Sequence, residues 1–128
     1  MRHPLHVLVV DDSELIVSKI KELLTEVPDI DSVQTANNAD NALQKIKNHT
    51  PDLIFLDLNM PGKNGVDLLQ DIKHDYPSTK VIIVSSHANQ FYRGLCKDIG
   101  ADNFIDKLTE FEKIPSLIKN LSKPAVLN

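Results

Sequence analysis

The sequence has little cysteine, no long apolar run and no excess of positive charge. Its one cysteine, Cys96, has no partner for an internal disulfide, so a reducing compartment, the cytoplasm, is expected. No apolar run approaches the roughly 20 residues that a membrane-spanning helix needs, and no membrane association is expected. The net charge of −4 argues against direct nucleic-acid binding and against binding to anionic membranes.

What is present fits one domain with an ordinary core: 128 residues, 41% hydrophobic and 25% charged. Runs rich in Val, Ile, Leu and Phe alternate with apolar stripes at helical spacing. The runs predict strands over 5–10, 32–36, 52–57, 80–85 and 103–106, of which 32–36 is short and polar and suits a sheet edge. The stripes predict helices around 16–27, 39–46, 66–72, 92–99 and 114–121, with Pro28 and Gly100 among their stops. Strict alternation of strand and helix predicts a doubly wound, parallel α/β sheet.

Polar side chains stand at the ends of four of these strands. Asp11 and Asp12 follow the first, Asp57 ends the third, Ser85 ends the fourth and Lys107 follows the fifth. Ligand sites in such sheets lie outside the carboxyl ends of the strands. We therefore expect all five side chains to open onto one edge of the sheet.

This edge carries three carboxylates against one ammonium, a balance that a divalent cation neutralises. Carboxylate and carbonyl oxygens favour Mg²⁺ over Zn²⁺, which is typically held by Cys and His. A carboxylate can also attack phosphorus and form an acyl phosphate. With Lys107 and the Ser85 hydroxyl available to the phosphoryl oxygens, the arrangement predicts phosphorylation at Asp57.

Asp11-Asp12, Asp57 with Asn59-Met60-Pro61-Gly62, Ser85 and Lys107 together resemble the receiver domains of response regulators, including single chemotaxis-type receivers. The resemblance covers residues 5–121, so residues 1–121 are interpreted as a receiver domain and 122–128 as a tail or the start of a linker. It implies a five-stranded sheet of flavodoxin-like order 2-1-3-4-5.

The resemblance also implies a role for each matching residue. Asp57 is the phosphoacceptor, and Mg²⁺ is bound by Asp12, Asp57 and the Asn59 backbone carbonyl, with Asp11 acting through water. Lys107 pairs with the phosphoryl group. Ser85 and Phe104 form the switch that couples phosphorylation to a surface built from the fourth helix, the fifth strand and the fifth helix.

As a member of this family the chain would not be an enzyme acting on a metabolite, although it would assist its own phosphorylation and dephosphorylation. Its phosphoryl donor would be a sensor histidine kinase or a histidine phosphotransfer protein. Its output would be a protein partner, an effector domain of a longer chain, or a phosphorylation-dependent homodimer. No helix-turn-helix fits after Leu121, and Gln90 and Arg93 of the fourth helix are expected to be exposed to a partner.

One position departs from the family pattern: Leu108 follows Lys107 where proline is usual, commonly after a cis bond. A cis bond before a non-proline residue costs about 2.5–4 kcal/mol, so a trans bond is expected here.

Several alternatives stay open. Asp11-Asp12 could be a helix-capping pair, Phe104 plain core, and Cys96 a packing residue. His87, two residues past Ser85, could tune hydrolysis together with the Asn59 side chain. The chain could also be a degenerate receiver that binds partners without phosphorylation. A phosphohydrolase or flavodoxin-like carrier fits less well, because Asn59 replaces a second aspartate and Asp11-Asp12 would repel a flavin phosphate.

Overall fold

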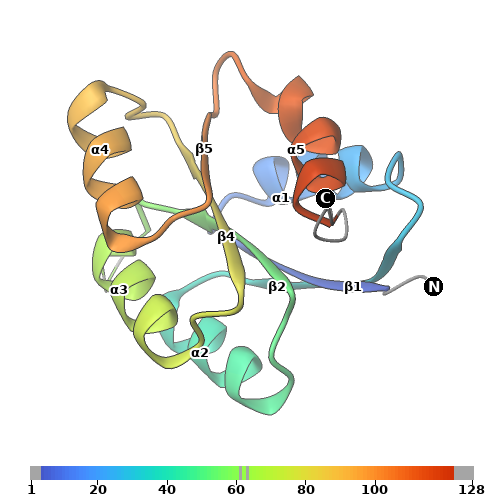
Figure 1. Cartoon of the computed structure of the whole chain (residues 1–128), viewed down its shortest axis with the longest axis horizontal. Coiled ribbons are helices and arrows are strands. Elements are labelled where there is room, and N and C mark those ends of the chain that lie inside the picture. Colours follow the sequence, from blue (N-terminus) through green and yellow to red (C-terminus); the bar gives the residue numbers. More distant parts are fainter. Residues whose placement is uncertain (1–3, 61, 63, 123–128) are drawn as a thin grey trace, which may run out of the picture.

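The structure, a computed structural model, describes residues 4–60, 62 and 64–122. Five parallel strands form one sheet in the order β2-β1-β3-β4-β5 (Figure 1). Their bounds are β1 Leu5–Val10, β2 Ile30–Ala36, β3 Leu53–Asp57, β4 Lys80–Ser85 and β5 Asn103–Asp106. The predicted fold class and strand order are confirmed.

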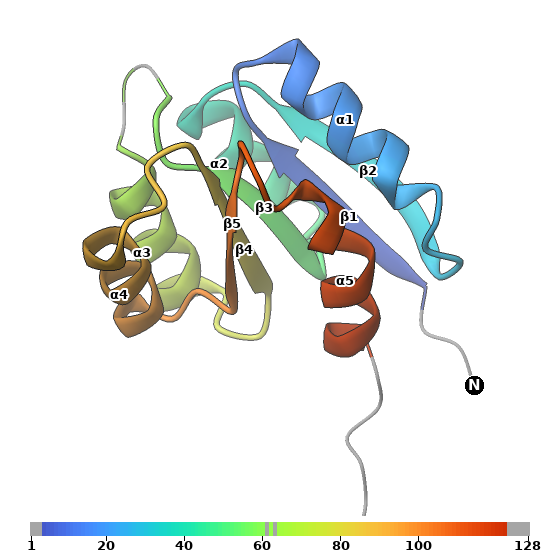
Figure 2. The ribbon, with the colours of Figure 1, turned by 90° about the horizontal axis from the view of Figure 1, so that it is seen from above.

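Helices alternate with the strands and cover both faces of the sheet. They are α1 Glu14–Leu24, α2 Ala39–Asn48, α3 Gly65–Asp75, α4 Gln90–Ile99 and α5 Ile114–Ser122, with a 3₁₀ turn η1 at Phe111–Lys113 before α5. Figure 2 shows α1 and α5 on one side of the sheet and α2, α3 and α4 on the other. In the part of the chain that is described, no helix is both long enough and apolar enough to cross a bilayer.

The helix starts are set by short polar side chains. Each of the first four helices is preceded by a residue in extended conformation whose side-chain oxygen accepts a backbone N–H from the first turn: Ser13, Asn38, Asn64 and Asn89. Such caps satisfy donors that the helix itself leaves unpaired. The four caps lie in the loops that follow β1, β2, β3 and β4, at the edge where the polar residues were predicted.

Two apolar cores fill the space between the sheet and its two helical layers. On the α1 and α5 side, Ile20, Ile114 and Ile118 pack with alternate strand residues such as Val9 and Phe55. On the other side, Ala42, Leu69 and Ile72 pack with the intervening ones, and Cys96 is fully buried among them. Because β3 is central, all five of its residues are buried, Asp57 included.

Two differences from the predicted boundaries have a clear cause in the structure. The edge strand β2 starts at Ile30, two residues earlier than predicted, because Leu5 of β1 pairs with Ile30 ahead of a register shift. Helix α1 ends at Leu24, so Val27 is buried in a following turn rather than in the helix. There the Val27 N–H donates to Leu24 three residues back, which tightens the turn. Pro61 and the tail residues 123–128 lie outside the described residues.

Candidate functional site

Three carboxylates meet at the carboxyl edge of the sheet. Asp11 and Asp12 follow β1, and Asp57 is the last residue of the adjacent strand β3. One carboxylate oxygen from each lies within 4.8 Å of those of the other two. Asp11 and Asp57 are only 3% and 2% exposed, whereas Asp12 is exposed. The structure therefore brings together the three acidic residues that the sequence placed at this edge, two of them in the interior.

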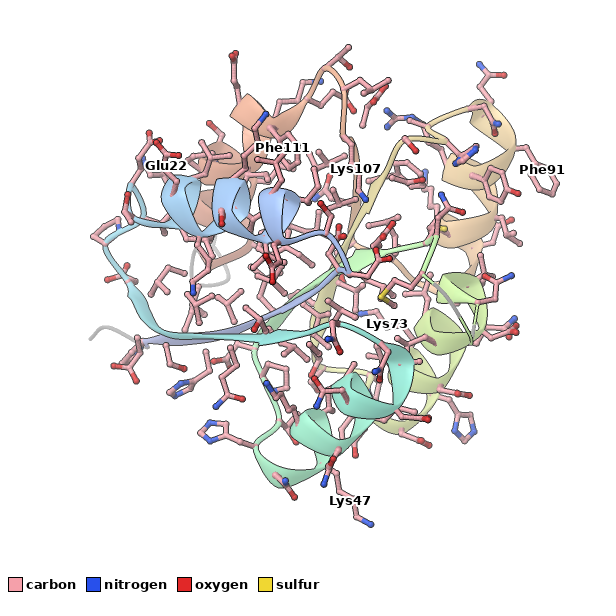
Figure 3. The ribbon with its side chains drawn as sticks, turned by 180° about the vertical axis from the view of Figure 1, so that it is seen from behind. Glu22, Lys47, Lys73, Phe91, Lys107 and Phe111 are labelled. Carbon is pink, nitrogen blue, oxygen red and sulfur yellow. The ribbon has the colours of Figure 1, made fainter. Side chains whose placement is uncertain are left out.

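Lys107 supplies the positive charge of this pocket. Its Nζ lies 3.1 Å from Oδ2 of Asp11 and 3.2 Å from Oδ1 of Asp57, and its side chain is 15% exposed. In Figure 3 the Lys107 side chain is directed into the molecule, unlike Phe91, which projects from α4 into solvent. The Lys107 N–H donates to the Ser85 carbonyl at 3.0 Å and so continues the β4–β5 pairing one residue past β5. The ammonium group is thus held against both buried carboxylates.

The backbone hydrogen bonds of the two buried carboxylates leave one buried oxygen of Asp11 that depends on charge compensation. Oδ1 of Asp11 accepts the Ser13 N–H at 2.9 Å, and Oδ1 of Asp57 accepts the Asn59 N–H at 3.0 Å. Oδ2 of Asp11 is buried, and its one close polar neighbour among the described residues is the Lys107 ammonium at 3.1 Å, which is shared with Asp57. Because one ammonium group serves two buried carboxylates, negative charge remains uncompensated, and a hard cation would balance it. The donor set fits Mg²⁺.

The pKa of Asp11 reflects the same burial. Desolvation raises the pKa of this carboxyl, and the charge of Asp57 raises it further, while the Ser13 hydrogen bond and Lys107 oppose the rise. A raised pKa means that the folded chain holds this proton more tightly than the unfolded chain. The Asp11 charge therefore costs stability as the pH rises above 3.8, and acid or a bound cation relieves that cost.

The helix-capping alternative for Asp11 and Asp12 is wrong. The N-cap of α1 is Ser13, whose Oγ accepts the Ile16 N–H at 3.3 Å. With Ser13 in that role, neither aspartate is needed to cap the helix.

The opposite rim of the pocket is formed by the loops after β3 and β4. Ser85 is fully buried, and its Oγ accepts the His87 N–H at 2.9 Å. The His87 ring and the Asn59 side-chain amide meet at 2.8 Å, Nδ1 to Nδ2, and join the two loops. Asn59, Met60, His87 and Tyr92 line a cavity of about 230 Å³ beside this contact. The sequence had proposed His87 and Asn59 from position alone, and the structure brings them into direct contact.

A second polar cluster, which the sequence analysis missed, joins α4 to β5 and η1. Phe104 is partly buried, and the Arg93 guanidinium carbon lies 5.0 Å from its ring centroid. Arg93 also donates from Nη2 to Oε1 of Glu110 at 2.7 Å, and Oε2 of Glu110 accepts from Lys113 at 2.7 Å. Arg93, which was expected to be exposed to a partner, has a side chain that is 38% exposed and a guanidinium group that is paired within the chain. The sequence gives no sign of this pairing, because Glu110 lies 17 residues from Arg93 and outside its helix.

The environment of Glu110 strongly favours its charged form. Hydrogen bonds from Lys113, Arg93 and the Asp106 N–H lower the pKa of Glu110 from 4.5 to about 2. A lowered pKa stabilises the folded chain above pH 4.5, and the contribution is lost as the pH falls toward about 2. At neutral pH Glu110 is a fixed negative charge between α4 and the β5–α5 connection.

Sequence reasoning also missed Gly65, the first residue of α3. A Cβ at this position would lie 2.5 Å from Cα of Leu58 and 2.7 Å from the carbonyl oxygen of Asp57. The helix therefore starts in direct backbone contact with the segment that carries Asp57. An Asn-Gly pair in the sequence indicates a turn, which gives no sign of this close approach.

One protein family accounts for both the fold and the acidic pocket. The family model for the response regulator receiver domain matches residues 7–119. The chain belongs to the response regulator receiver family. Receivers of this family are signalling domains rather than metabolic enzymes, and they act between histidine kinases and effectors.

Curated relatives of this receiver are response regulators. Response regulator protein VraR of Staphylococcus saprophyticus is 36% identical over 118 residues, covering 91% of this chain and 56% of VraR. Nitrate/nitrite response regulator protein NarL of Escherichia coli is 32% identical over 126 residues, covering 97% of this chain and 56% of NarL. The receiver thus spans about half the length of the curated relatives it matches.

Solved structures agree with this assignment. CheY in the CheX–CheY–BeF₃–Mg²⁺ complex from Borrelia burgdorferi has a TM-score of 0.85 at 28% identity, over 94% of this chain and 91% of that one. The isolated receiver domain of RcsB from Salmonella enterica, in the presence of phosphomimetic BeF₃⁻, has a TM-score of 0.87 at 19% identity, over 93% and 88%. The latter likeness concerns the fold alone.

At the position where this receiver departs from the family pattern, the Lys107–Leu108 peptide is trans, since the described residues contain no cis bond. The Leu108 side chain is 78% exposed, and the Leu108 N–H donates to Oδ1 of Asp106 at 2.8 Å. The expected trans bond is confirmed.

Proposed function

We propose that this receiver accepts a phosphoryl group on Asp57 from a phosphohistidine, in a reaction that depends on Mg²⁺, and that phosphorylation changes its binding to a partner. The observation that carries the proposal is the buried pocket in which Asp57 contacts Lys107 and lies beside Asp11 and Asp12. Three carboxylates against one ammonium group cost folding stability unless a cation balances their charge.

In the transfer, a carboxylate oxygen of Asp57 attacks phosphorus, a P–O bond forms, and the P–N bond to the donor imidazole breaks. The Lys107 ammonium group and the Ser85 hydroxyl can donate to the phosphoryl oxygens, because Lys107 Nζ lies 3.2 Å from Oδ1 of Asp57 and Ser85 ends β4, the strand that pairs with β3. Bound Mg²⁺, held by Asp12, Asp57 and the Asn59 carbonyl with Asp11 through water, would supply further positive charge to these oxygens.

The donor would be a sensor histidine kinase or a phosphotransfer protein. Two exposed leucines lie close in the chain to residues of the pocket: Leu15, three residues after Asp12, is 67% exposed, and Leu108, directly after Lys107, is 78% exposed. Large exposed apolar side chains next to a reactive group support docking of a protein rather than reaction with a free metabolite.

Phosphorylation would be transmitted through Ser85 and Phe104. The Ser85 hydroxyl oxygen accepts a backbone N–H, which leaves its own proton for a phosphoryl oxygen. Movement of Ser85 toward that group would vacate space for the partly buried Phe104 ring. The surface of α4, β5 and α5 would change shape as a result.

The output of the whole protein depends on what this surface contacts. Among the longer curated relatives is EvgA of Escherichia coli, of which this receiver matches 56% and which is named as a DNA-binding transcriptional activator. We propose that any DNA binding belongs to segments outside this receiver, whose own net charge is −4. Binding of an effector domain, of a separate protein or of a second receiver would each use the switched surface.

The test is intact mass after incubation with Mg²⁺ and acetyl phosphate. We expect a gain of one phosphoryl group that disappears with a chelator and in Asp57→Asn, which keeps the shape of the side chain but removes the nucleophile. If the natural chain gains no mass and also fails to bind beryllofluoride, it is a degenerate receiver that acts without phosphorylation.

His87 gives a further prediction about the lifetime of the phosphorylated form. Its contact with Asn59 at 2.8 Å ties together the two loops that border Asp57 and Ser85. His87→Ala should free both loops, admit water more readily and speed dephosphorylation, on the order of tenfold for one lost hydrogen bond of about 1.4 kcal/mol. Decay of the phosphorylated mass after donor removal measures this rate, with the exposed His74→Ala as control. An unchanged rate in His87→Ala would remove His87 from this role.

A further inference from the structure

The segment that carries Lys107 is held by a closed set of hydrogen bonds centred on Glu110. The Asp106 N–H donates to Oε1 of Glu110 at 2.9 Å, and the Glu110 N–H donates back to the Asp106 carbonyl at 3.0 Å. Within this loop the Leu108 N–H donates to the Asp106 side chain at 2.8 Å. The backbone on both sides of Lys107 is therefore fixed by contacts between Asp106 and Glu110.

The Glu110 carboxylate is itself fixed from three elements. Oε1 is shared between the Asp106 N–H of β5 and the Arg93 guanidinium of α4, and Oε2 accepts from Lys113 of η1. The side chain is 19% exposed, although its loop neighbour Leu108 is 78% exposed. A carboxylate with this many charge-assisted donors has a well-defined position.

We infer that Glu110 is a positioning residue for Lys107, and that it holds this loop where the chain lacks a proline after the lysine. A proline would restrict the backbone directly, because its ring fixes φ near −65°. Leu108 imposes no such restriction. The hydrogen bonds between Glu110 and Asp106 restrict the backbone of this loop instead. The side chain that benefits is Lys107, whose Nζ must reach Asp11 and Asp57 at 3.1 and 3.2 Å.

Arg93 extends the same set of contacts to Phe104. Its Nη1 donates to the Phe104 carbonyl at 3.4 Å, and its guanidinium lies over the Phe104 ring. Glu110 therefore links the loop that carries Lys107 to the aromatic ring of the proposed switch. This consequence rests on the proposed function, whereas the positioning of Lys107 does not.

The first experiment is amide hydrogen exchange of the metal-free chain, followed by NMR. In Glu110→Ala the Asp106 N–H loses its acceptor, and we expect it to exchange about tenfold faster, while amides of β1 and β3 are unchanged. Glu110→Gln keeps an acceptor oxygen and should lie close to the natural chain. The matched control is Glu112→Ala, which removes an exposed glutamate two residues away. Asp106 protection that is unchanged in Glu110→Ala overturns the inference.

The second experiment measures the affinities for beryllofluoride and for Mg²⁺, and so distinguishes the contribution of Lys107 to binding from that of the carboxylates. Glu110→Ala should weaken beryllofluoride binding in the presence of Mg²⁺ about tenfold, because Lys107 contacts that group. Mg²⁺ binding alone should not weaken, since all three aspartates remain. A merely structural defect would lower both affinities together, and that result, or no loss of beryllofluoride binding, contradicts the inference. If the natural chain binds no beryllofluoride, the proposed function fails, and amide exchange alone decides the role of Glu110.

Discussion

Replacing Gly65 with alanine is expected to destabilise the receiver by about 3 kcal/mol, near the upper end of overpacking penalties. The added methyl group would lie 2.5 Å from Cα of Leu58 and within 3 Å of two backbone carbonyl oxygens. No side-chain rotation relieves this clash, because all three atoms belong to the backbone. Either α3 must shift away from the sheet or the end of β3 must move, and the latter displaces Asp57. Urea unfolding of Gly65→Ala measures the loss, and its phosphorylation rate should fall with it.

The matched control for this change is Gly94→Ala. Gly94 lies within α4, and a Cβ at this position meets nothing within 4 Å. Alanine is favoured over glycine inside a helix by roughly 0.8–1.0 kcal/mol, so Gly94→Ala should stabilise the chain. The two variants add the same methyl group to the same residue type with opposite expected signs. Equal unfolding midpoints for Gly65→Ala and the natural chain would show that the contact at the start of α3 is not a constraint.

Much of the site could be predicted because a parallel sheet places the ends of its strands at one edge. Asp57 at the end of a continuous apolar strand and Asp11-Asp12 after another are visible as patterns in the chain, and the rule of strand ends makes them neighbours. Glu110 has no such pattern, since it stands in a polar loop and its partner Arg93 comes from a different element. Its position became evident only when α4 and the β5–α5 connection were placed side by side.

Apolar periodicity alone could not predict where α1 ends or why Gly65 is needed at the start of α3. An apolar stripe records which residues face the core, and Val27 does face it, but from a turn rather than from a helix. Gly65 shows the opposite case, in which a residue without a side chain is constrained by the backbone that passes it. Both constraints arise from packing between segments, which composition and spacing do not encode.

The second large effect is expected at Lys107. In Lys107→Met the side chain keeps its approximate length but loses its charge, which leaves Asp11 and Asp57 buried at 3% and 2% exposure without their counter-ion. Removing one partner of a buried ion pair typically costs about 3–5 kcal/mol, so we expect a loss of about 3 kcal/mol at pH 7 without metal. Beryllofluoride binding should fall as well, because the ammonium donor to that group is gone.

Two conditions should reverse the loss in Lys107→Met, since its cause is uncompensated negative charge. Added Mg²⁺ should restore most of the stability by binding the folded chain alone. Lowering the pH should also reduce the deficit, because the unpaired carboxylates of the folded variant bind protons more tightly than those of the unfolded chain. The control is Lys73→Met, which removes another partly buried lysine, 3.0 Å from Asp102 and outside the pocket. Its loss should not depend on Mg²⁺, and a Lys107→Met deficit that is equally insensitive would show that Lys107 does not balance the charge of a metal-binding pocket.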